Sequence, residues 1–104
     1  MKKCKIEFLP SAWREIDEIS SYYLNKVGPK STKKIFYRIL KSIPKLEIFP
    51  LSCPLINDEE LRQEGYRIII CDNYIFIYRL INKVVYIYHI ANKRTNYKNL
   101  IQKN

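Results

Sequence analysis

The feature that most constrains this chain is a change in the spacing of its apolar residues near Gly65. From residue 12 to residue 46, apolar side chains recur every three or four positions, as on one side of a helix, and after Gly65 they alternate with a period of two, as in strands. The strand-like segments run from Tyr66 to Cys71, from Tyr74 to Ile81 and from Val84 to Ala91. The dipeptides between them are of the kind that close hairpins. The C-terminal half therefore predicts a three-strand antiparallel meander.

Two helices are predicted in the N-terminal half, after a short strand from Lys3 to Leu9. The residues at 10 and 11 suit a helix start, because proline fits the first turn and serine caps it. Gly28 is expected to end this helix and Pro29 to open the next one. Pro44 interrupts the second apolar pattern and should break or kink it, leaving a short extra turn. Two helices joined by a Gly-Pro turn form an antiparallel hairpin.

The remaining segments are predicted from weaker signals. Residues 49–64 hold prolines and acids with little periodicity and are expected to form a loop, whereas residues 96–102 can form one or two helical turns with Asn96 as a cap. The fold class is therefore α+β, with an N-terminal strand, a helical hairpin, a three-strand meander and a short C-terminal helix. The hairpin is expected to cover one sheet face and, because antiparallel sheets tolerate an open face, the other is expected to be open.

Length and composition limit the class of protein. The 104 residues are expected to form one domain, 1–104. No apolar run is long enough for a membrane span, and the N-terminus lacks the apolar stretch of a signal peptide, which favours a cytoplasmic protein. Three widely spaced cysteines fit reduced thiols. With one histidine and two glycines, neither a metal cluster nor a phosphate-binding glycine loop is expected, so we predict no metal and no cofactor.

The chain is strongly basic, with 19 lysines and arginines against 10 acids and a net charge of +9. Such a charge favours an anionic partner such as nucleic acid, the ribosome surface or an acidic protein segment. At helical spacing, five of the basic side chains form one stripe. They are Lys30, Lys34, Arg38, Lys41 and Lys45. An ordinary solvated helix face is the alternative interpretation.

Five polar residues stand out in or after the strands. Arg67 and His89 lie within apolar strand patterns, while Lys93, Arg94 and Tyr97 follow the last strand. A turn after residue 91 would bring these groups together near Arg67 at one sheet end. Arginines can hold a phosphate, and histidine or tyrosine can transfer protons, so this set suits phosphoryl chemistry without metal. The simpler interpretations are a strand-end arginine that reaches water and a histidine satisfied within the fold.

Several short motifs along the chain fit a known family. They are Phe8-Leu9-Pro10-Ser11-Ala12, Gly28-Pro29, Leu46-Glu47-Ile48-Phe49-Pro50, Gly65-Tyr66-Arg67, Asn73-Tyr74, Tyr78-Arg79 and the segment from His89 to Tyr97. In this order and spacing, the chain resembles the RelE/ParE superfamily of toxins from bacterial type II toxin–antitoxin modules. The resemblance implies a helical hairpin on an antiparallel sheet and a cognate antitoxin as partner.

The same resemblance implies one of two activities. RelE-like members cleave mRNA on the translating ribosome without metal, by attack of the RNA 2′-hydroxyl on the adjacent phosphate. ParE-like members inhibit DNA gyrase and are not known as nucleases. Our leading hypothesis is the mRNA endonuclease, which blocks translation and growth, because three candidate groups follow one strand closely. Gyrase inhibition is the alternative.

On the endonuclease hypothesis, the resemblance assigns roles to single residues. Arg67 matches the phosphate-stabilising arginine of RelE-like nucleases and Arg94 resembles their second arginine. His89 lies near the position where some relatives have a catalytic histidine, and Tyr97 matches their terminal tyrosine at a shorter spacing. The basic stripe and Lys93 would bind RNA and the ribosome.

Overall fold

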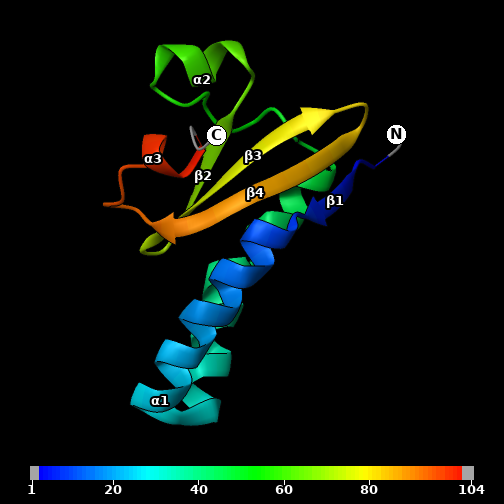
Figure 1. Ribbon diagram of the computed structural model, residues 1–104. Coiled ribbons are helices and arrows are strands. Elements are labelled where there is room, and N and C mark those ends of the chain that lie inside the picture. The colour runs from blue at the N-terminus through cyan, green and yellow to red at the C-terminus, as the bar shows by residue number, and fades with distance from the viewer. Residues whose placement is uncertain (1–2, 102–104) are drawn as a thin grey trace.

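The computed structural model describes residues 3–101 and has the predicted α+β architecture (Figure 1). A sheet of β-strands carries a long bent helix on one side, with two short helices on the other. The elements are β1 (Lys5–Phe8), α1 (Pro10–Leu40), the 3-10 helix η1 (Ile43–Glu47), α2 (Glu59–Gln63), β2 (Arg67–Cys71), β3 (Tyr74–Ile81), β4 (Val84–Asn92) and α3 (Lys98–Ile101). The predicted order of strand, helices and meander is thereby confirmed.

The sheet has the strand order β1-β4-β3-β2. Strands β2, β3 and β4 pair antiparallel as the predicted meander, and β1 adds to β4 in parallel. The tight turns need left-handed backbone at Asp72, Asn82 and Lys83, whose φ angles are 60°, 49° and 66°. Asparagine and aspartate tolerate this region best among residues with a side chain, which explains why these dipeptides signal hairpins.

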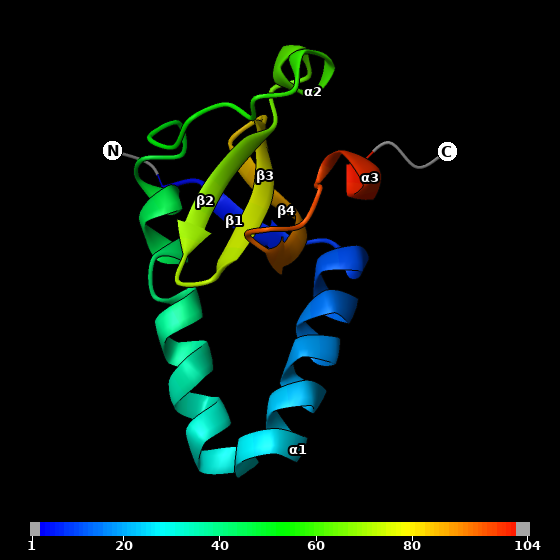
Figure 2. The ribbon, with the colours of Figure 1, turned by 90° about the vertical axis from the view of Figure 1, so that its left-hand side faces the viewer.

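The long helix α1 is two helices that meet at Gly28, as the Gly-Pro signal predicts. Gly28 has φ 80° and ψ 173°, outside the helical region, and Pro29 starts the second helix. The hydroxyl of Thr32 donates to the carbonyl oxygen of Gly28 at 2.8 Å, which satisfies one group at the break. Figure 2 shows the two arms joined at a tip that projects beyond the sheet. The second arm ends at Leu40, and Pro44 lies in the first turn of η1. Proline is tolerated there because the first N–H groups of a helix have no partner within it.

The main core lies between α1, η1 and the sheet. Its fully buried members include Ile39 and Leu46 from the helical side, and Phe76, Tyr78 and Ile87 from the strands. The hydroxyl of Tyr78 donates to the carbonyl oxygen of Pro50 at 2.7 Å, so the polar end of this large ring has a partner. Burial of the ring raises the pKa of Tyr78.

A second apolar cluster covers the other sheet face, which corrects the expectation that this face is open. Ile56, Leu61 and Ile77 are buried there, and Tyr97 and Leu100 from the C-terminal segment pack against them. Residues 3–101 thus form an apolar layer on each side of the sheet, and on the second side Ile70 of β2 remains exposed.

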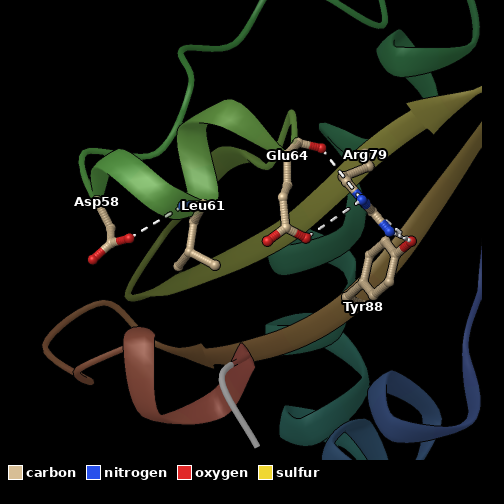
Figure 3. Close-up of polar contacts among 5 residues, drawn as sticks. All are labelled: Asp58, Leu61, Glu64, Arg79 and Tyr88. Atoms are coloured by element: carbon tan, nitrogen blue, oxygen red, sulfur yellow. Dashed lines mark hydrogen bonds and ion pairs between the residues drawn. The ribbon is translucent and has the colours of Figure 1, made fainter.

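Residues 49–64 were expected to form a loop, and the structure places the five-residue helix α2 within them. The carboxylate of Asp58 accepts a hydrogen bond from the backbone N–H of Leu61 at 3.1 Å (Figure 3). This bond lowers the pKa of Asp58, and the Lys98 ammonium group, 3.4 Å from the carboxylate, lowers it further. Acidic residues in the first turn and Arg62 in the last suit the helix dipole, so local charge explains a helix that periodicity missed.

No helix among residues 3–101 is long and apolar enough to cross a membrane.

The backbone at Gly28 gives a direct test of the hairpin. In Gly28→Ala the new Cβ meets no atom within 4 Å, so the cost is backbone strain alone. We expect a loss of about 1–3 kcal/mol in the free energy of unfolding. Urea denaturation measures this, with Asn25→Ala on the exposed surface of the same helix as the control. An unchanged midpoint for Gly28→Ala would show that the observed turn geometry does not control hairpin stability.

Candidate functional site

The outer edge of β4 is closed by side chains from the start of α1. Strand β1 pairs only with residues 84–87 of β4. Beyond that point Ser11 Oγ donates to the carbonyl oxygen of Tyr88 at 2.6 Å, and the N–H of Ile90 donates to Glu15 Oε1 at 3.0 Å. The helix side chains therefore continue the hydrogen bonding that β1 begins, which fixes α1 against the sheet.

His89 is held at the same edge. Its Nδ1 lies 2.8 Å from Glu15 Oε2, and only 15% of the His89 side chain and 17% of the Glu15 side chain are exposed. Because an ionised carboxylate only accepts hydrogen bonds, Nδ1 must carry the proton, and in a neutral ring Nε2 is then the basic nitrogen. One carboxylate thus orients the imidazole and also satisfies a strand N–H.

Arg67 begins β2, and its guanidinium binds the loop that precedes α2. Its Nη1 donates to the carbonyl oxygen of Cys53 at 2.6 Å and lies 3.4 Å from that of Leu51. Tyr78 is the register partner of Arg67 on β3 and is also bonded to this loop. The guanidinium therefore has a structural task, which is to fasten residues 50–53 to the sheet.

Arg94 and Lys93 lie beyond the far end of β4. Together with Asn73 and Asn92 they line a small polar depression of about 300 Å³. The backbone N–H of Lys93 donates to the carbonyl oxygen of Asn73, and the N–H of Arg94 donates to the Asn92 side chain. Both cationic side chains are exposed. In this depression two cations and two amides surround an open space.

The four candidate catalytic residues are not brought together. Arg67 is the first residue of β2. Arg94 comes two residues after Asn92, which pairs with Tyr74 of β3, and Tyr74 in turn pairs with Cys71, the last residue of β2. The two arginines thus belong to opposite ends of β2, ~13 Å apart along the strand and with β3 between them. Tyr97 packs on the second apolar cluster, and His89 faces Glu15.

The predicted basic stripe is divided by the end of α1. Lys30, Lys34 and Arg38 remain on one helix, and Lys41 is its C-terminal cap residue. Lys45 lies in η1 and lines a different cavity, of about 460 Å³, beside β2.

Sequence reasoning missed an arginine–tyrosine cluster on the face away from α1, and Figure 3 shows its Arg79 and Tyr88 beside Glu64. Arg79 lies over the rings of Tyr66 and Tyr88 at 4.5 and 5.0 Å and bonds the Tyr88 hydroxyl at 2.7 Å. Its Nη1 also reaches the carbonyl oxygen and carboxylate of Glu64, at 3.3 and 4.0 Å. Burial works against the charge, but the Tyr88 bond and the neighbouring rings outweigh it and raise the pKa of Arg79. Tyr66, Arg79 and Tyr88 come from three separate segments of the chain, so no local spacing in the sequence signals this cluster.

The cysteines do not form a reactive centre. Cys53 and Cys71 are buried and Cys4 is half-buried, all as free thiols. Burial, with the neighbouring Cys53, raises the pKa of Cys71 to about 11. A thiol with this pKa stays protonated near neutral pH and is a poor nucleophile.

Two solved structures of toxin–antitoxin systems share this fold. The chain is similar to a structure described as the chromosomal ParDE toxin–antitoxin system from P. aeruginosa, with a TM-score of 0.72 and 16% identity over 86% of this chain and 96% of that one. It is also similar to the toxin–antitoxin complex RelBE2 from Mycobacterium tuberculosis, with a TM-score of 0.56 and 18% identity over 88% of this chain and 99% of that one. At these identities the likeness establishes the fold.

The sequence itself establishes the family. Residues 6–97 match the family described as the ParE toxin of the type II toxin–antitoxin system parDE. The chain therefore belongs to the ParE toxin family, within the RelE/ParE superfamily that its motifs predicted. A comparison with curated protein sequences gives no match.

The contacts of Glu15 predict its contribution to stability. Glu15→Ala removes the acceptor of the Ile90 N–H and the partner of His89, so we expect the free energy of unfolding to fall by about 1–3 kcal/mol. Chemical denaturation of Glu15→Ala and of Glu18→Ala, an exposed carboxylate on the same helix, provides the comparison. Equal stability of the two variants would contradict the structural role given to Glu15.

Proposed function

We propose that this type II toxin acts by binding a protein target, DNA gyrase, and does not cleave RNA. Membership of the ParE family supports the choice, because the resemblance implies gyrase inhibition for ParE-like members. The proposal reverses the order of the two activities expected from the sequence. Its main support from the molecule is the separation of the two arginines expected to hold a phosphate.

That separation matters because a phosphoryl-transfer site needs its cations around one phosphate. Groups that stabilise a transition state must lie within hydrogen-bond distance of the developing charge. Arg67 and Arg94 start from opposite ends of β2, and Arg67 already donates to the carbonyl oxygens of two loop residues. To reach a phosphate beside Arg94, the Arg67 guanidinium would have to give up its bonds to the carbonyl oxygens of Cys53 and Leu51.

One observation favours the alternative, ribosome-dependent mRNA cleavage. The pair of Glu15 and His89 has the arrangement in which a carboxylate orients an imidazole as a general base. In this protein the same carboxylate also binds the Ile90 N–H, which explains the pair as a device that closes the edge of β4. The structural explanation uses both carboxylate oxygens, and the catalytic one uses a single oxygen.

Two assays on the purified protein separate the activities. We expect the toxin to inhibit supercoiling of relaxed plasmid by gyrase, and we expect mRNA in a translation extract to stay intact at the same dose. Mapping of RNA 5′ ends after brief induction extends the second assay to cells. New RNA ends together with full supercoiling activity would reject gyrase as the target.

The exposed Arg94 allows a matched genetic test. Arg94→Gln removes a cation that the nuclease hypothesis needs and that has no side-chain partner among the described residues. We expect this variant to remain toxic when induced, with Lys5→Gln as a charge-matched control at the other end of the molecule. Loss of toxicity in Arg94→Gln alone, with the fold intact by circular dichroism, would favour RNA cleavage.

We also propose that a cognate antitoxin neutralises the chain. The fold is shared with toxins from toxin–antitoxin complexes, and the net charge of +9 favours a partner with acidic segments. Coexpression of the neighbouring open reading frame is expected to restore growth, and the two proteins are expected to copurify. Continued growth arrest with both proteins expressed would exclude that frame as the antitoxin.

A further inference from the structure

The second arm of α1 carries a basic depression that neither the fold nor the proposed target explains. Its lining consists of Lys30, Lys33, Lys34, Tyr37 and Arg38, which enclose about 540 Å³. We refer to these five residues as the basic face. All five are exposed, with 73% of Tyr37 accessible to solvent.

The helix geometry puts the tyrosine among the cations. At about 100° per residue, Lys30 and Lys34 lie on one side of Tyr37 and Lys33 lies on the other. Arg38 lies further round on the side of Lys34. The face extends about 12 Å along the helix. An exposed aromatic ring therefore lies between positive charges on a rigid element.

Opposing charge is scarce around this face. The sequence contains no aspartate or glutamate from residue 19 to residue 46. Arg38 pairs with Asp72 at 3.5 Å, whereas Lys30, Lys33 and Lys34 have no ion-pair partner among residues 3–101. The face also lies on the arm that projects beyond the sheet, where a long ligand can approach it (Figure 2). Its positive potential is therefore available to a ligand.

We propose that the basic face binds single-stranded DNA, with a base stacked on Tyr37 and phosphates held by the three lysines. Proteins that bind single strands combine a cationic groove with an aromatic ring, because every base offers a face for stacking. An acidic peptide would use the charges but would leave the exposed ring without a task. A duplex would likewise bind the lysines and keep its bases stacked away from Tyr37.

The choice of DNA over RNA rests on the proposed function, since gyrase acts on DNA. Binding itself is measured without gyrase, so either proposal can fail without the other. Fluorescence anisotropy with a labelled oligo-dT of about 12 nucleotides is a suitable measurement, with oligo-U of equal length as the RNA arm. Salt titration then separates the charge contribution from stacking.

Two variants should give different signatures. In Lys30→Gln/Lys33→Gln/Lys34→Gln we expect the slope of log affinity against log salt to fall by about 2, at about 0.7 per cation for a single strand. In Tyr37→Ala we expect affinity to fall about tenfold at every salt concentration with the slope unchanged. Tyr37→Phe, which keeps the ring, is expected to bind like the parent protein.

The control is a variant that loses the same charge elsewhere, Lys5→Gln/Arg14→Gln/Arg62→Gln, whose three residues are exposed on other surfaces. It should keep the parent slope. No binding of oligo-dT at low salt, an equal loss in the control, or full affinity in Tyr37→Ala would overturn the proposal. Clearly tighter binding of oligo-U than of oligo-dT would overturn the assignment to DNA.

Discussion

The hydrogen bonding along the outer edge of β4 is the constraint on which the rest of the structure depends. A strand edge leaves N–H and C=O groups that must find partners. Here β1 pairs with the first part of the edge, and the side chains of Ser11 and Glu15 form hydrogen bonds with the next part. Because β1 and α1 are consecutive, this shared task sets where the first arm of the helix lies on the sheet. The main core forms on the side that this placement encloses.

The same edge explains the environment of the single histidine. His89 looks in isolation like a proton-transfer group, but its partner is Glu15, 74 residues earlier in the chain. The carboxylate closes the edge and orients the ring in one contact. A well-oriented histidine is therefore no sign of catalysis here until a phosphate-binding group is found beside it.

Local patterns predicted most of the fold. The change of period located the meander, and Gly28 with Pro29 located the tip of the hairpin to the residue. The helix α2 was missed because five residues carry no periodicity, although Asp58 and the acids after it are a capping signal that could have found it. The covered second face was missed because its apolar partners come from separate segments near residues 56, 61 and 97.

The candidate site was predicted less well, for physical reasons that particular residues illustrate. Strand alternation predicts the face on which a side chain lies. It does not predict which residues of other strands lie beside it, and for this reason Arg67 and Arg94 were predicted to lie together. Register settles this, and register depends on long-range pairing. A bulge between Ile77 and Tyr78 also breaks the alternation in the facing strand, so that Ile87 and Ile90 both join the main core. The bulge has no sequence marker.

The tip of the hairpin extends beyond its last bonds to the sheet, which are those of Tyr23 and Arg38, and this overhang gives it the mechanics of a lever. Ser11 and Glu15 fasten the first arm near its start, Tyr23 bonds to Tyr74 further along it, and the tip at Gly28 lies about 20 Å beyond Glu15 along the helix axis. A load applied near the tip would act with a long moment arm on a few short hydrogen bonds at the strand edge. A macromolecule bound to the distal arm would therefore pull on the hydrogen bonds that Ser11 and Glu15 make with β4.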